Sequence, residues 1–72
     1  MQYAVAIERS VESVGAYVPD LPGCVAVGET EAEVRHLIRE AIALHLDGMR
    51  EDGETIPTPS AHVEYVEVGR AM

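Results

Sequence analysis

The sequence contains no lysine, and its cationic residues are too few and too scattered to form a nucleic-acid-binding surface. Five arginines stand against thirteen acidic residues in a chain of 72, and the formal net charge is −8. Proteins that bind DNA or RNA gain affinity by neutralising phosphates, which this chain would mostly repel. We therefore expect no direct nucleic-acid binding. An acidic surface suits either solubility or a basic protein partner.

Paired cysteines and long apolar runs are also absent. Cys24 is the single cysteine, so no disulfide can form within the chain. No apolar run approaches the ~20 residues that span a bilayer, and no basic segment followed by an apolar one opens the chain. These absences predict a soluble cytoplasmic protein without membrane contact.

The chain has no linker, internal repeat or low-complexity tract, so residues 1–72 are expected to form a single domain. A chain of this length buries only about 60% of its unfolded surface on folding. A core of that size is marginal, and we therefore expect a homo-oligomer, either a dimer or a tetramer.

Four segments have the composition and alternation of β-strands: residues 2–8, 15–18, 24–27 and 62–68. In the first, the large residues Tyr3, Val5 and Ile7 alternate with small or polar ones. In the last, the alternation slips between Tyr65 and Val66, which indicates a bulge or a strand that is covered on both faces.

Residues 31–51 carry the strongest helix signal. Thr30 and Glu33 have the spacing of a capping box, and Gly53 is a natural C-terminal stop. Apolar residues then recur at steps of three and four. Leu44 and Leu46 widen the apolar arc, which indicates either a broad groove or a second face used by another subunit, and we favour the second.

These elements predict an α+β fold in the order β-β-β-α-β, a two-layer sandwich with one helix on one face of the sheet. A right-handed crossover would place the last strand parallel to the first or the third. The bare face would carry either Ala4 and Ala6 or the larger Tyr3, Val5 and Ile7. Neither set resembles a solvent-facing surface, so we expect that face or an edge strand to be buried against a second copy.

No convincing active site emerges from the sequence. Cys24 is either a reactive thiol beside an exposed turn or a small buried residue, and no Cys-His spacing supports the first. His36 and His45 lie on opposite sides of the predicted helix and cannot share a metal within one chain. We therefore expect no catalytic residue, no metal ligand and no cofactor.

One stretch is more specific than these general patterns. The segment Tyr-Val-Pro-Asp-Leu-Pro-Gly-Cys (residues 17–24) is followed by Gly-Glu-Thr (28–30) and by the acidic helix start Glu-Ala-Glu (31–33). The helix ends in Leu-His-Leu-Asp-Gly-Met-Arg-Glu-Asp-Gly-Glu (44–54), which leads into Ile-Pro-Thr-Pro (56–59). Over essentially its whole length, the chain resembles the HicB family of bacterial and archaeal antitoxins.

The resemblance implies a partial RNase H-type sheet of strand order 3-2-1-4, with the fourth strand parallel to the first. It also implies a partner, because HicB proteins bind and block HicA, a small basic toxin that cleaves mRNA. A charge of −8 suits a protein that covers a cationic surface. Many HicB proteins carry a C-terminal DNA-binding domain. Only four residues follow the last predicted strand here, so we expect no operator-binding domain in this chain.

The signature turn of this resemblance comprises Pro19, Asp20, Leu21, Pro22, Gly23 and Cys24. These residues either fix a backbone shape or contact a partner, and we favour the structural role. Two alternatives to an antitoxin stay open. The first is a stand-alone oligomeric module that binds another partner or a small ligand, and the second is an enzyme that uses Cys24 or the histidines.

Overall fold

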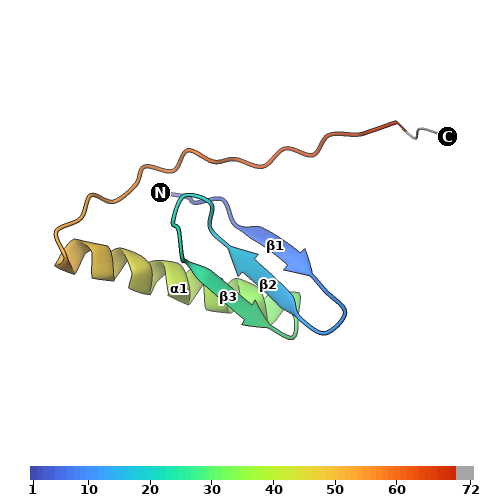
Figure 1. Ribbon diagram of the computed structural model, residues 1–72, viewed down its shortest axis with the longest axis horizontal. Coiled ribbons are helices and arrows are strands. Elements are labelled where there is room, and N and C mark those ends of the chain that lie inside the picture. The colour runs from blue at the N-terminus through green and yellow to red at the C-terminus, as the bar shows by residue number, and fades with distance from the viewer. Residues whose placement is uncertain (70–72) are drawn as a thin grey trace.

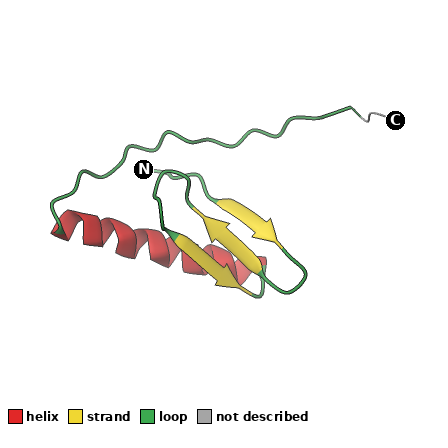
Figure 2. Ribbon diagram, in the orientation of Figure 1, coloured by secondary structure: helices red, strands yellow, loops and turns green. Residues whose placement is uncertain are grey.

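The computed structural model describes residues 1–69 and places three short strands beside one long helix (Figure 1). The elements are β1 (Ala6–Arg9), β2 (Val14–Tyr17), β3 (Val25–Gly28) and α1 (Glu31–Glu51). The strands form one antiparallel sheet in the order β1-β2-β3, and α1 lies against one face of it (Figure 2). The α+β class expected from the sequence is confirmed.

The first strand is shorter than its alternation predicts. Ala6 pairs with Tyr17 at one end of the β1–β2 ladder, and Arg9 pairs with Val14 at the other. After Tyr17 the chain turns away into the signature turn, so residues 2–5 extend beyond the end of β2 and have no strand to pair with.

The core is the layer between the sheet and the helix. Leu21 and Val34 are fully buried in it. The other buried apolar residues are Val14, Ala16, Val18, Cys24, Ile38 and Leu46. Because successive side chains of a strand point to opposite faces, the alternate residues of β2 and the turn that follows it supply most of the sheet's share.

The N-terminus of α1 is capped by side chains. The Glu33 amide donates to Oγ1 of Thr30 at 3.1 Å, and the Glu29 amide donates to Oε1 of Glu33 at 3.1 Å. The second bond reaches one residue further back than in a regular capping box. Gly28 makes room for it, since a Cβ there would overlap the Glu33 carboxylate and lie 3.0 Å from a Val34 methyl.

The C-terminus of α1 ends in a Schellman motif. Gly53 has a φ of +73°, its amide donates to the Arg50 carbonyl at 3.1 Å, and the Glu54 amide donates to the Met49 carbonyl at 2.9 Å. This turn favours glycine because a residue without a Cβ has no steric penalty in the left-handed conformation. The chain then reverses direction and runs back past the sheet (Figure 1).

The expectation of a fourth strand over residues 62–68 was wrong for the isolated chain. The segment is extended but pairs with no strand among the described residues, and its apolar side chains face solvent. Val63 is 57% exposed, Tyr65 97%, Val66 75% and Val68 79%. Strand character is therefore present in the sequence without a neighbouring strand close enough to pair with.

The structure also decides which residues of the first strand face the helix. Tyr3, Val5 and Ile7 pack against the core, so Ala4 and Ala6 belong to the bare face of the sheet. The larger set is therefore the inward one.

Truncating the core side of α1 is expected to destabilise the fold. Val34→Ala removes two buried methyl groups and should lower the free energy of unfolding by about 2 kcal/mol. Val27→Ala makes the same change on the exposed face, where Val27 is 66% exposed, and should cost less than about 0.5 kcal/mol. Urea unfolding followed by circular dichroism measures both, and equal losses would contradict the assigned core.

Candidate interaction site

The signature turn is a compact backbone loop anchored in the core. The Leu21 amide donates to the Val18 carbonyl at 3.0 Å, and the Cys24 amide donates to the Leu21 carbonyl at 3.0 Å. Gly23 takes a φ of +85°, a conformation that favours glycine. Leu21, in the middle of the turn, is 0% exposed and packs in the core.

Cys24 lies under this turn and is 3% exposed. Burial raises the pKa of its thiol, so little thiolate is present at neutral pH. Since the thiolate is the reactive form, this environment favours a packing role over a nucleophilic one.

Asp20 connects the turn to a distant part of the chain. Its carboxylate accepts hydrogen bonds from the Ser60 amide at 2.9 Å, the Ser60 hydroxyl at 2.9 Å and the Ala61 amide at 3.0 Å. The two backbone hydrogen bonds, that from Ser60 foremost, lower the pKa of Asp20. Nothing in the local sequence pattern links the turn to a serine forty residues later, so this contact could not be predicted from the sequence.

A second contact holds the same connector, residues 54–61. The Tyr3 hydroxyl donates to the Pro57 carbonyl at 2.5 Å, and Ile56 packs against the core. Together with the Asp20 carboxylate, these contacts hold the connector to the domain. The direction in which residues 62–69 leave is therefore set by the turn and by the first residues of the chain.

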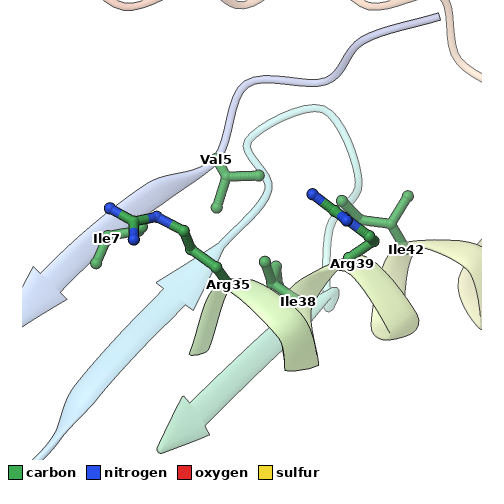
Figure 3. Close-up of a pocket in the computed structure, with 6 residues that line it drawn as sticks. All are labelled: Val5, Ile7, Arg35, Ile38, Arg39 and Ile42. Carbon is green, nitrogen blue, oxygen red and sulfur yellow. The ribbon is translucent and has the colours of Figure 1, made fainter. Parts of the chain in front are cut away.

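An open apolar groove lies between β1 and α1 (Figure 3). It has a volume of about 340 Å³ and is lined by Val5, Ile7, Ile38, Ile42, Arg35 and Arg39. The groove exists because α1 packs mainly on β3 and β2, which leaves the inward side chains of β1 only partly covered. A single helix is too narrow to cover all three strands.

The rim of this groove is cationic. Glu31 binds both Arg9 and Arg35, the latter at 2.7 Å, and the hydrogen bond from Arg9 is the main cause of the lowered pKa of Glu31. Arg39 has no carboxylate partner within residues 1–69. The groove therefore combines an apolar floor with at least one free positive charge.

The opposite face of the sheet carries a second exposed apolar area, which we call the bare face. Tyr17 is 44% exposed, Val25 60% and Val27 66%. These residues, together with Glu8 and Gly15, surround a shallow hollow of about 240 Å³. An apolar surface beside a carboxylate is suited to a partner that offers both apolar and cationic groups.

The outer side of the helix offers less. His36 lies 3.1 Å from Glu40 on the surface, and in the described part of the chain no three His, Cys, Asp or Glu side chains gather as a metal site. Of the two leucines that widen the apolar arc, Leu46 belongs to the core and Leu44 is 73% exposed.

The chain is thus a small α+β domain with two exposed apolar surfaces, and comparison with known proteins identifies its family. Residues 3–69 match the family described as "HicB_like antitoxin of bacterial toxin-antitoxin system". The chain therefore belongs to the HicB-like antitoxin family.

Three relatives and one structure support this assignment. "Antitoxin HicB 2" of Photorhabdus laumondii is 33% identical over 94% of this chain and 50% of its own length. "UPF0150 protein Ta0767" of Thermoplasma acidophilum is 36% identical over 85% of this chain and 90% of its own length. A 14.9 kDa protein of Haemophilus phage HP1 is 36% identical over 92% of this chain and 50% of its own length.

The chain thus spans about half the length of two of these relatives. The solved structure "HicA3 and HicB3 toxin-antitoxin complex" contains a similar chain, with 32% identity and a TM-score of 0.70 over 83% of this chain and 70% of that one. Within residues 1–69, no helix is both long and apolar enough to cross a membrane.

Removing the Asp20 carboxylate is expected to release the connector. Asp20→Asn should speed hydrogen exchange of the Ser60 and Ala61 amides by about tenfold, whereas Asp52→Asn, on an exposed residue at the helix end, should leave it unchanged. Since the native pKa is lowered, the contact should survive at pH 3.8, the ordinary value, and be lost only as the pH falls through the native pKa. Exchange rates that are insensitive to both changes would contradict the assigned contact.

Proposed function

We propose that this chain acts as an antitoxin by binding a small basic RNA-cleaving toxin of the HicA type and covering its active surface. On this proposal the chain has no catalytic activity of its own. The observation that carries the proposal is the similarity to a chain in the HicA3 and HicB3 complex, with 32% identity over 83% of this chain. Membership of an antitoxin family supports the same role.

The charge of the chain supports a cationic partner. At −8, it would attract a protein built to bind the phosphates of RNA and would repel RNA itself. Complementary charge speeds encounter and disfavours wrong partners more than it adds affinity. The lasting contact therefore needs apolar surface as well.

We place the toxin on the bare face of the sheet. Tyr17, Val25 and Val27 are large exposed residues on adjacent strands, and Glu8 adds a negative charge at the same hollow. Aromatic residues that are buried on binding commonly contribute most to the affinity of an interface. A basic protein with an apolar patch fits this surface better than the cationic groove on the other side.

A cationic substitution on the bare face should weaken toxin binding. Val27→Lys places a positive charge against the basic partner in the proposed contact and should weaken binding by at least about a hundredfold. Val11→Lys is the matched control, because Val11 is fully exposed in the turn between β1 and β2. Co-purification with a co-expressed small basic protein of the HicA type, together with rescue of growth, measures both variants.

The same complex should weaken as salt rises, because exposed charge pairs are screened. An absence of any complex with a small basic protein, with no rescue of growth, would overturn the antitoxin role. A complex that Val27→Lys leaves intact would overturn only the placement on the bare face.

A further inference from the structure

Residues 62–68 form an extended segment without a pairing partner among the described residues, and the outer edge of β1 is also unpaired. The backbone of β1 pairs with β2 on one side only, and such an edge readily accepts another strand. Tyr65 lies across an open space of about 470 Å³ from Val5, Ile7 and Arg9. The segment passes the open side of β1 and diverges from it without pairing (Figure 1).

We propose that the segment 62–68 of a second copy of this chain fills this space and pairs with the edge of β1. In a symmetric pair, each segment would enter the space of the other copy. The sheet would then be continuous across the dimer, in the order β1, partner segment, own segment, partner β1. Each inserted segment satisfies backbone groups on both of its sides, which the isolated chain leaves to solvent.

The surface area of the chain supports a missing partner. The accessible surface is 5750 Å², whereas a folded monomer of this mass should expose about 4,400 Å². The radius of gyration is 14.7 Å, against roughly 11 Å for a compact domain of this length. The accessible surface therefore exceeds that of a compact monomer by more than the ~800 Å² that each partner buries in a standard stable interface.

The side chains of the segment suit an inner strand. In a regular strand Val63 and Tyr65 would point to one side, and Val66 and Val68 to the other, so both sides would carry apolar residues. Such a segment is better suited to an inner strand of a sheet than to an exposed edge. In the proposed dimer, the slip in alternation between Tyr65 and Val66 therefore gives an inner strand apolar residues on both sides.

Charge complementarity also favours the segment as the occupant. The groove beside β1 carries Arg39, which lacks a carboxylate partner within residues 1–69. The segment carries Glu64 and Glu67 and no arginine or lysine. A second copy therefore brings both the apolar surface and the opposite charge that the groove lacks.

A test needs only the full chain and no toxin, so its result is separate from that of the proposed function. Sedimentation at about 100 µM should give twice the chain mass of 7.8 kDa, or a multiple of that dimer. In an equal mixture of isotope-labelled and unlabelled chains, filtered nuclear Overhauser effects should join residues 62–68 to Val5 and Ile7 between different chains. A single-chain mass, or contacts found only within one chain, would overturn the proposal.

A matched pair of variants adds a second measurement. Val66→Lys should raise the dissociation constant of the dimer by at least about tenfold, because it places a positive charge within the new sheet and beside a cationic groove. Val11→Lys makes the same change at another exposed valine and should leave the constant unchanged. Equal dissociation constants for both variants and the unaltered chain would also overturn the proposal.

Discussion

The structure depends on the fact that one helix can cover only part of a three-stranded sheet. The apolar stripe of α1, with Val34 and Ile38 at its centre, packs mainly on β2 and β3 and closes the core there. Val5 and Ile7 on β1 are consequently left at the margin, where the groove opens. The exposed groove follows from this packing, since residues 1–69 contain no second helix that could cover the margin.

The signature turn links this core to the rest of the chain. Leu21 fixes the turn from inside by packing, while Asp20 faces outward and holds Ser60 and Ala61. The two roles occupy adjacent residues because a tight turn reverses the side-chain direction within one step. A motif that looks like a local backbone device thus also determines where the last quarter of the chain lies. Both roles of the turn are structural, and neither needs a partner protein.

Features that depend on neighbouring residues could be predicted from the sequence, whereas features that depend on contacts between distant residues could not. The helix bounds of Glu31–Glu51 were predicted correctly because caps at Thr30 and Gly53 act within a few residues. The ends of the strands differ from the predicted ones because the length of a β-ladder depends on the partner strand as well as on the segment's own sequence. The Asp20–Ser60 contact leaves no local signal in the sequence, and the strand expected over residues 62–68 lacks a pairing partner among residues 1–69. Alternation reports that a segment is suited to a sheet, but not which sheet it joins.

An incomplete sheet ties the stability of this domain to its concentration. If a second copy supplies the strand beside β1, dilution removes it, and the marginal core must then stand alone. Strand addition uses the backbone groups of an edge, whereas the bare face offers the side chains of Tyr17, Val25 and Val27. The two proposed contacts therefore draw on different atoms of the same sheet. On these two proposals, one chain would complete its sheet through the edge of β1 and still present the bare face to a basic partner, so self-association and toxin binding would not compete.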